Sequence, residues 1–306
     1  MKALIATGQS EALVTLGEAE RPRPLPGEAL IKVEAFSVNR GEIFSLQDRD
    51  PGWRPGKDIA GVVVQAAADA VTPAAGQRVT GHAEEGGWAQ YAAVPAGSLA
   101  VIPDSISAIQ AAALPLAGLT ALRLLRIGGN ITGQRLLLTG ASGGVGHYVT
   151  ELAAAAGAEV TAVTASAERG RRLDELGAAE IIHDVADAHG PYQLVLESTG
   201  GKNLALAAER LAHRGTLIWF GQASLEPATL SFFDLRDGPG SVTIRQFSYW
   251  DFPSPYGADL AILVRLVATG RLHPEIGRIA DWADTAATLT DLAQRRIRGN
   301  AVLTVS

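Results

Sequence analysis

The sequence contains no cysteine among its 306 residues. Without a thiol, the chain forms no disulfide bond and has no thiolate nucleophile, cysteine-ligated iron–sulfur cluster or cysteine-ligated zinc. These kinds of chemistry are excluded before any pattern in the sequence is considered.

The chain also lacks an excess of positive charge. Lys and Arg number 26 against 32 Asp and Glu, which gives a formal net charge of -6. Such a chain has no overall attraction for the phosphates of a nucleic acid or for an anionic membrane surface. We therefore expect a small-molecule partner and no nucleic acid.

No apolar run reaches the roughly 18 residues of a membrane-spanning helix. The most apolar stretch, 111–125, is interrupted by Pro115 and Arg123, and the N-terminal MKALIATG reaches a glycine before a signal-type apolar segment develops. We expect no membrane partner and, by default, a cytoplasmic location.

What the chain does have is the composition of a packed globular protein, with 47% hydrophobic and 19% charged residues. Its length suggests two domains at about 150 residues per domain. The first third shows apolar residues at every second position in 30–38, 58–66 and 87–95, separated by stretches rich in proline and glycine. This pattern predicts a predominantly β region.

From about residue 117 the pattern changes to alternating helices and strands. A helix through LTALRLLRI stops at Gly128, and a continuously apolar strand at 135–140 precedes a helix that ends at Gly157. Further strands are predicted at 159–164, 180–182, 193–197 and 216–221, with helices through Leu173 and Leu176 and near 202–212. The alternation predicts a parallel sheet covered by helices. Another strand at 241–247, helices at 259–269 and about 284–297, and a last strand at 300–305 complete the chain.

The main chemical signal is GASGGVG, in which Gly140, Gly143 and Gly146 are spaced three apart between the apolar strand and the following helix. Glycine permits a tight turn and a close approach of the backbone to a pyrophosphate, and the helix start offers free N–H groups. The segment predicts dinucleotide binding. The alternative is a glycine-rich turn without a ligand.

The next strand indicates which dinucleotide is bound. NAD sites usually place an acid about 20 residues past the motif, but this chain reads Thr164, Ala165 and Ser166, followed by Arg169. An arginine makes charge-assisted hydrogen bonds to a phosphate, so NADPH is the better match. These arginines could alternatively only solvate a helix.

Six segments together resemble the zinc-independent quinone oxidoreductase branch of the medium-chain dehydrogenase/reductase superfamily. They are SVNRGE (37–42), GKDIAGVV (56–63), GGWAQYAAVP (86–95), AAALPLAGLTAL (111–122), LLLTGASGGVG (136–146) and RGNAVLTV (298–305). The resemblance implies a GroES-like β domain of residues 1–114, completed by 256–306, and a central Rossmann doubly wound domain of residues 115–255. It also implies an active site in the cleft between the domains and, commonly, a homodimer.

The resemblance further implies reduction of quinones or α,β-unsaturated carbonyl compounds by NADPH. By motif, Asn39 is expected near the nicotinamide and substrate, as a catalytic residue. The residues expected to bind the cofactor are Thr120, Gly140, Ser142, Gly143, Gly144, Val145, Gly146, Ser166, Arg169, Gly221 and, where the family commonly has lysine, Asn300.

Two departures from the family pattern bear on the chemistry. Zinc-dependent relatives have a cysteine ligand and a GHE segment, where this chain has no cysteine and reads Gly56, Lys57 and Asp58. Many quinone reductases carry a tyrosine after the VN motif, and none occurs between Asn39 and Gly61. We therefore expect no metal, and no tyrosine proton donor in that segment.

Negative charge builds on the acceptor's carbonyl oxygen during reduction, and an amide donor such as Asn39 could stabilise it before solvent delivers the proton. A purely structural role for Asn39 is the alternative. The six histidines show no ligand spacing, and Ser142 does not lie in a G-x-S-x-G elbow. The aromatic segment QFSYWDF (246–252) could be an interface, a pocket wall or core. Two further functions stay open, a pathway-specific enoyl or ketone reductase and a non-catalytic NADPH-binding scaffold or sensor.

Overall fold

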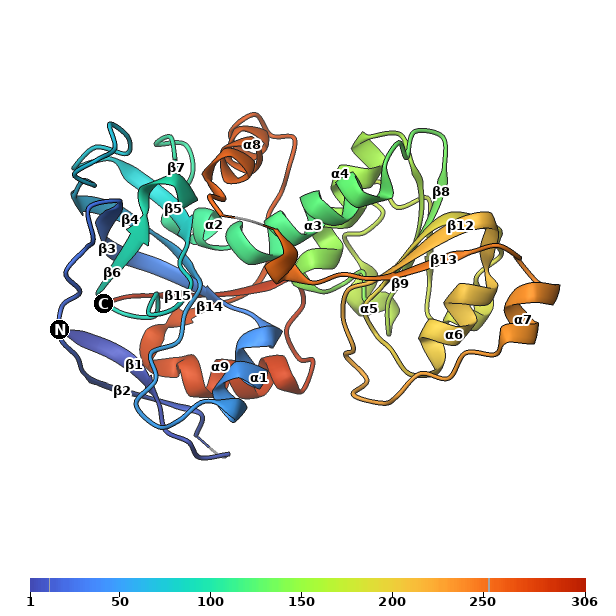
Figure 1. Ribbon diagram of the computed structural model, residues 1–306, viewed down its shortest axis with the longest axis horizontal. Helices are drawn as coiled ribbons and strands as arrows, with labels where there is room; N and C mark the ends of the chain where they lie inside the picture. Colours follow the sequence, from blue (N-terminus) through green and yellow to red (C-terminus); the bar gives the residue numbers. More distant parts are fainter. Residues whose placement is uncertain (11, 253) are drawn as a thin grey trace. The chain divides into compact units, whose positions relative to one another are not determined.

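The computed structural model describes residues 1–10, 12–252 and 254–306, and they form two compact units (Figure 1). The second unit is Thr120–Phe252, and the first contains Met1–Leu119 together with the C-terminal segment after Phe252. We expected these boundaries at 114/115 and 255/256, and the structure divides the chain at 119/120 and 252/253. The first crossing falls inside helix α3 (Pro115–Gly128).

The second unit is built on a six-stranded parallel sheet in the order β10-β9-β8-β11-β12-β13. From β8 the chain adds strands on one side and then returns to add β11, β12 and β13 on the other. The reversal makes the edge between β8 and β11 a topological switch point, where ligands of such sheets bind. The strands are β8 (Arg135–Thr139), β9 (Glu159–Val163), β10 (Glu180–Ile182), β11 (Tyr192–Glu197), β12 (Leu211–Trp219) and β13 (Thr243–Gln246).

Helices accompany this sheet, and its central strands are buried on both faces. Leu136, Leu137 and Leu138 of β8 are all fully buried, which explains why that strand reads as a continuous apolar run without alternation. The helices of the unit are the larger part of α3, α4 (Gly144–Ala155), α5 (Ala167–Gly170), α6 (Lys202–Glu209), α7 (Phe232–Asp237) and the short 3₁₀ turns η2 (Val185–Asp187) and η3 (Tyr249–Asp251).

Two of the predicted element bounds in this unit are wrong. The helix predicted near 202–212 ends at Glu209, and the strand predicted at 216–221 already begins at Leu211, because β12 pairs with β11 along nine residues. The helix predicted through Leu173 and Leu176 consists of only the four residues of α5 followed by turns, although both leucines are buried as expected.

The first unit is a mainly antiparallel β structure. Its large sheet runs β14-β15-β3-β4-β5-β7, with β6 paired to β3, and β1 and β2 form a separate hairpin. The strands are β1 (Lys2–Ala6), β2 (Val14–Glu18), β3 (Glu28–Val38), β4 (Asp58–Gln65), β5 (Arg78–His82), β6 (Tyr91–Pro95), β7 (Leu99–Val101), β14 (Ile276–Asp281) and β15 (Asn300–Thr304).

Both chain ends contribute to this unit. Strand β15 pairs antiparallel with β3, with Leu303 opposite Phe36, so the predicted last strand does rejoin the first region. The helices of the unit are α1 (Arg40–Asp48), α2 (Ala108–Ala112), the start of α3, α8 (Gly257–Ala268), α9 (Thr285–Ala293) and the 3₁₀ turns η1 (Ala96–Ser98) and η4 (Trp282–Asp284). The predicted architecture, a parallel sheet with helices plus a β domain from both ends, is confirmed.

Helix α1 was not predicted from the sequence. Nine residues with a glycine at the second position carry little helical periodicity. The available signal is Asn39 followed three residues later by Glu42, the spacing of a helix N-terminus. Asn39 is indeed the N-cap residue, and its backbone N–H donates to Glu42 Oε2 at 2.9 Å.

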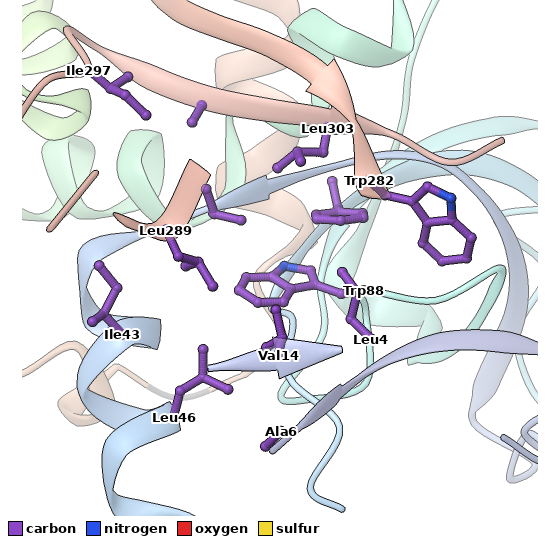
Figure 2. Packing of buried hydrophobic residues seen from close by; sticks show 13 residues of the cluster. Leu4, Ala6, Val14, Ile43, Leu46, Trp88, Trp282, Leu289, Ile297 and Leu303 are labelled. Carbon is purple, nitrogen blue, oxygen red and sulfur yellow. The ribbon is translucent and has the colours of Figure 1, made fainter. Parts of the chain in front are cut away.

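A cluster of buried apolar side chains holds the hairpin, α1, α9 and β15 of the first unit together (Figure 2). Trp88 lies fully buried in it, stacks on Phe36 with ring centroids 5.5 Å apart, and donates its Nε1–H to the Ser37 carbonyl oxygen at 3.1 Å. Trp88 therefore combines a large buried area with a satisfied polar atom, which is the arrangement that stabilises a buried tryptophan most.

We expect Trp88→Ala to lower the free energy of unfolding by about 3–5 kcal/mol, because it removes the largest side chain of this cluster and leaves a cavity. Trp250→Ala, at a side chain 66% exposed, is the matched control and should cost less than about 1 kcal/mol. Urea denaturation followed by far-ultraviolet circular dichroism measures both values. Equal losses in the two variants would contradict the role assigned to Trp88.

Candidate active site

The glycine segment forms a tight turn between β8 and α4. Gly140 has φ +64°, a backbone conformation that favours glycine, and a Cβ there would lie 2.5 Å from Ser198 Oγ. A Cβ on Gly146 would lie 2.4 Å from the Ala141 carbonyl oxygen and 2.5 Å from that of Gly140. Helix α4 thus starts directly against the turn, with Gly143 as its N-cap residue. The first N–H groups of α4 are available to an anion.

A buried carboxylate shapes the neighbouring strand end. Glu197, the last residue of β11, is fully buried, and its Oε1 accepts hydrogen bonds from Thr139 Oγ1 at 2.9 Å and from the Thr199 N–H at 2.8 Å. Its Oε2 accepts the Gly200 N–H at 3.0 Å. The carboxylate therefore ties the end of β8 to the loop after β11 at the topological switch point.

The residues expected to bind a 2'-phosphate are brought to the same edge of the sheet. Arg169 Nε donates to Ser142 Oγ of the glycine turn at 3.2 Å, and the Arg169 N–H donates to Ser166 Oγ at 3.4 Å. Ser166 is the N-cap residue of α5, directly after β9. Residues 27 positions apart in sequence thus form one group of one cation and two hydroxyls, without an acid at the end of β9.

Other expected cofactor residues lie at separate places. Gly221 follows β12, and a Cβ there would lie 2.9 Å from the Ser198 carbonyl oxygen, so it borders the same loop as Glu197. Thr120 is buried within α3. Asn300 belongs to the first unit, on β15, where its Nδ2 donates to the Glu275 carbonyl oxygen at 3.1 Å.

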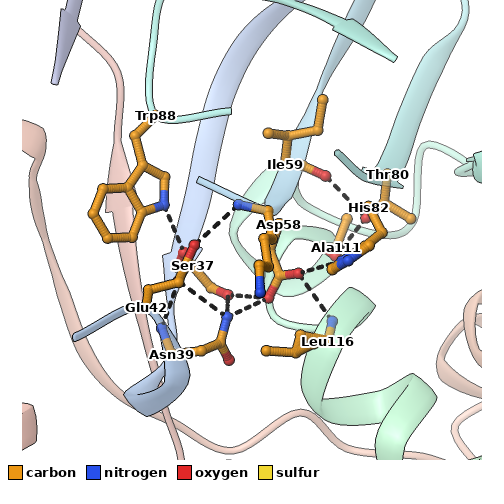
Figure 3. A network of polar contacts seen from close by, with 11 residues as sticks. Ser37, Asn39, Glu42, Asp58, Ile59, Thr80, His82, Trp88, Ala111 and Leu116 are labelled. Atoms are coloured by element: carbon orange, nitrogen blue, oxygen red, sulfur yellow. Dashed lines mark hydrogen bonds and ion pairs between the residues drawn. The ribbon is translucent and has the colours of Figure 1, made fainter. Parts of the chain in front are cut away.

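In the first unit, Asn39 belongs to a buried polar network around Asp58 (Figure 3). Asp58 is fully buried, and its Oδ2 accepts from Ser37 Oγ and from Asn39 Nδ2, both at 2.7 Å. Its Oδ1 lies 3.2 Å from His82 Nδ1 and accepts the Leu116 N–H at 2.9 Å. The carboxylate thus joins the end of β3, the start of β4, the end of β5 and the first turn of α3.

The orientation of the Asn39 amide differs from the expectation of a free donor. A carboxylate only accepts hydrogen bonds, so the amide nitrogen, not the oxygen, must face Asp58. The other possible acceptors, Ser37 Oγ and Glu42 Oε2, each lie 3.5 Å from the same nitrogen. Its donor is therefore already used within the protein.

Glu42 is a second buried acid beside this network. Its Oε1 accepts the Lys57 N–H at 3.0 Å, and its Oε2 accepts the Asn39 N–H. Burial, together with the nearby charge of Asp58, raises the pKa of Glu42 from 4.5 to about 8, although Lys57 and the two backbone donors oppose the rise. Near neutral pH Glu42 is therefore mostly protonated.

Sequence reasoning did not identify Glu42, Asp58 and His82 as a group. Asp58 was noted only as part of the segment at the place of a zinc ligand pair, and His82 only as a residue without ligand spacing. The alternation in β4 and β5 could have placed Asp58 and His82 opposite each other, since they are register partners in the antiparallel pair. Their burial became visible only in the folded chain.

These residues do not suit a zinc ion. The oxygens of Asp58 are engaged by four hydrogen-bond donors, His82 turns Nδ1 toward that carboxylate, and no cysteine exists to join them. Elsewhere in residues 1–10, 12–252 and 254–306, no group of three or more His, Asp or Glu side chains is arranged to hold a metal. Within those ranges, no helix combines the length and apolar character required to cross a bilayer.

The aromatic segment after β13 divides between two of its expected environments. Phe247 is buried and packs on Phe252 with ring centroids 5.5 Å apart, whereas Trp250 is exposed. Arg123 of α3 lies over the rings of Tyr249 and Phe252, at 5.1 and 4.7 Å from their centroids. Part of the segment is thus core, and Trp250 alone faces solvent.

Comparison with known protein families gives two matches. The family described as alcohol dehydrogenase GroES-like domain matches residues 25–104, and the family described as zinc-binding dehydrogenase matches residues 144–259. The first match lies in the first unit, and most of the second match lies in the parallel-sheet unit.

Two curated relatives and one solved structure are also similar. The chain is 35% identical over 197 residues to the chloroplast envelope quinone oxidoreductase homolog of Arabidopsis thaliana, covering 59% of this chain and 58% of that protein. It is 29% identical over 296 residues, 88% of this chain, to a mycocerosic acid synthase-like polyketide synthase of Mycolicibacterium smegmatis, of which it spans 14%. The Escherichia coli quinone oxidoreductase complexed with NADPH superposes with a TM-score of 0.87 at 21% identity, over 99% of this chain and 100% of that one.

The close contact at Gly146 generates the first prediction for this site. We expect Gly146→Ala to destabilise the fold by about 1–3 kcal/mol, because its methyl group must displace backbone atoms of the turn. The matched control is Gly143→Ala, where the Cβ meets only the Gly140 carbonyl oxygen at 3.3 Å, and we expect it to cost less than about 1 kcal/mol. Thermal unfolding without ligand measures both, and a well-tolerated Gly146→Ala would contradict the geometry of the turn.

The raised pKa of Glu42 predicts a pH dependence of stability. Between pH 4.5 and about 8 the folded protein holds the Glu42 proton and the unfolded chain does not. The free energy of unfolding therefore falls as pH rises through this window, by at most about 1.4 kcal/mol per pH unit from this group, and levels off above it.

Denaturant unfolding at pH 5 to 9 tests this dependence. Glu42→Gln cannot titrate and should flatten the decline between pH 5 and 8, while Glu84→Gln, at an exposed side chain, should retain it. If the Glu42→Gln profile runs parallel to that of the unchanged protein, Glu42 is ionised in the folded state and the assignment is wrong.

Proposed function

Since the chain belongs to the medium-chain dehydrogenase/reductase superfamily, in its quinone oxidoreductase branch, we propose that it is an NADPH-dependent oxidoreductase that transfers hydride to a quinone or an α,β-unsaturated carbonyl compound without zinc. The chain spans 58% of the Arabidopsis relative's length, and the proposal concerns the activity of this chain as a whole. The coarser conclusion, an oxidoreductase that uses a nicotinamide cofactor, has the support of the family itself.

The observation that carries the proposal is the anion site at the carboxyl ends of β8 and β9. A cradle that a single Cβ at Gly146 would fill, the first N–H groups of α4 and the Glu197-anchored loop suit a pyrophosphate. Arg169, Ser142 and Ser166 supply a cation and two hydroxyls where an NAD site would carry an acid. This donor set favours a phosphate over the bare ribose hydroxyl.

In this proposal the residues of the cradle bind and orient the cofactor. Residues Ser142 to Gly146 bind the diphosphate through main-chain N–H groups, and Arg169 with Ser166 binds the 2'-phosphate. Thr120 and Gly221 are proposed at the nicotinamide half, and Asn300 as a weaker contact, because its amide nitrogen is already bonded to the Glu275 carbonyl oxygen. When bound, the reduced nicotinamide supplies the hydride.

The absence of zinc is proposed from the donor set described above. A zinc-dependent reduction needs an open coordination position on a metal held by protein ligands. In this chain the residues at the place of the zinc ligands form the saturated Asp58 network instead. Charge on the acceptor oxygen would then be neutralised by a proton from solvent, because no tyrosine occurs between Asn39 and Gly61.

A pathway-specific enoyl reductase is the second candidate. It is favoured by one observation, the match of 88% of this chain to a segment of a polyketide synthase. An enoyl reductase would use the same cofactor site and the same hydride transfer to a conjugated double bond. The two candidates differ only in the acceptor, so kinetics with each acceptor class separates them.

A homodimer is a further part of the proposal. Strand β13 is the outer strand of the parallel sheet, and all four of its residues are exposed. Its unpaired backbone groups and the apolar side chain of Ile244, 37% exposed, suit pairing with the same strand of a second copy.

We expect the purified protein to oxidise NADPH with quinones or enones, and Arg169→Ala to weaken NADPH binding about 10- to 100-fold more than NADH binding, because it removes one charged hydrogen-bond donor from the 2'-phosphate. Arg172→Ala is the control, since Arg172 pairs with Glu175 at 3.5 Å. Fluorescence titration with both nucleotides and steady-state kinetics across the acceptor panel measure the effects.

Two outcomes would contradict parts of the proposal. Equal losses of NADPH and NADH affinity in Arg169→Ala would remove Arg169 from recognition of the 2'-phosphate. NADPH binding without oxidation by any quinone, enone or enoyl thioester would favour a non-catalytic scaffold or sensor over an enzyme.

A further inference from the structure

The polarity of the Asn39 side chain is set by its neighbours. Its Nδ2 donates to Asp58 Oδ2 at 2.7 Å, and the amide oxygen lies on the opposite side of the group from that nitrogen, away from Asp58 in Figure 3. Rotating the amide by half a turn would bring Oδ1 against the Asp58 carboxylate, two acceptors with no hydrogen between them. The geometry therefore holds Oδ1 outward.

Asp58 is itself held in place, so this orientation is rigid. Its other partners are the Ser37 hydroxyl, the His82 ring and the first turn of α3 at Leu116. On the far side of Asn39, the backbone N–H is bonded to Glu42 Oε2. With backbone and side chain both fixed, Asn39 presents one available group, a carbonyl oxygen that accepts hydrogen bonds.

An outward acceptor discriminates between the two ligands of a reductase. A quinone or an enone carries only acceptor oxygens before it is reduced, so it gains nothing from Oδ1. A nicotinamide nucleotide carries donors, the carboxamide NH₂ and the ribose hydroxyls. The observations thus favour the cofactor over the carbonyl substrate as the partner of Asn39.

We propose that Asp58 is a positioning residue that fixes the Asn39 amide with its oxygen outward, so that Asn39 accepts a hydrogen bond from the nicotinamide or ribose end of the cofactor. This inference rests on the proposed function. It replaces the expected role of Asn39 as an oxyanion donor and gives the Asp58 network a function beyond holding β4 and α3 together.

The inference is tested with four variants and NADPH as the probe. Asp58→Asn offers an NH₂ group to Asn39, which lets the Asn39 amide turn its own nitrogen outward. We expect this variant to bind NADPH about tenfold more weakly, Asn39→Ala to show a similar loss, and the double variant to be no weaker than either, because both changes remove the same contact. Thr80→Val is the control, since Thr80 is equally buried and bonds to Ile59 and Ala111 but not to Asp58.

A pH readout separates positioning from a merely structural role. In Asn39→Asp the new carboxylate faces Asp58, and only a proton shared between the two can replace the lost amide hydrogen. The charged groups around it are Asp58, Glu42 and Lys57, with His82 behind Asp58. We expect its NADPH affinity, relative to the unchanged protein at each pH, to recover at least tenfold as pH is lowered from 8 to 5.

The outcomes distinguish this inference from the proposed function. If the unchanged protein binds no NADPH, both are overturned. If it binds NADPH and Asp58→Asn binds equally well, or if the losses of Asp58→Asn and Asn39→Ala multiply in the double variant, the positioning role alone is overturned. Should Asp58→Asn fail to fold by circular dichroism, the pH profile of Asn39→Asp decides, and a flat relative affinity overturns the inference.

Discussion

The cofactor edge of the second unit depends on a contact that only glycine permits. Helix α4 begins so close to the turn before it that a Cβ on Gly146 would lie within 2.5 Å of two carbonyl oxygens. Because the helix starts there, its free N–H groups lie at the carboxyl end of β8, next to the loop that Glu197 holds. Every proposed contact with the phosphates follows from this close packing, and Arg169 reaches Ser142 across the same turn.

A comparable constraint organises the first unit, with a carboxylate in place of a glycine turn. Burying an ionised acid is costly unless its oxygens are fully hydrogen-bonded. Asp58 meets this requirement with four donors from four different elements, so the network can form only when the sheet, α1 and α3 are all in place. Glu42, which has only backbone donors besides the distant Asn39 amide, holds a proton instead. Two acids in one site therefore carry different charges.

This division of charge bears on the chemistry that the protein can perform. Hydride transfer from a nicotinamide asks little of protein side chains beyond binding and orientation. The network supplies orientation, because Asp58 commits the Asn39 donor and leaves its oxygen for a ligand. A saturated carboxylate also has no lone pair left for a metal, so the same hydrogen bonds that orient Asn39 make this place unsuitable for zinc.

The sequence by itself determined the architecture and the cofactor site. Strand β8, the GASGGVG turn and α4 are contiguous, so their hydrophobic pattern and glycine spacing predict local structure directly, and the missing acid after β9 is likewise a local feature. Only the tertiary structure decided the polar network, since Ser37, Asn39, Asp58, His82 and Leu116 come from segments up to 79 positions apart and meet through sheet register and helix packing. The direction of an amide and the protonation of a buried acid depend on neighbours in space, and for that reason the acceptor at Asn39 and the neutral Glu42 became visible only in the folded chain.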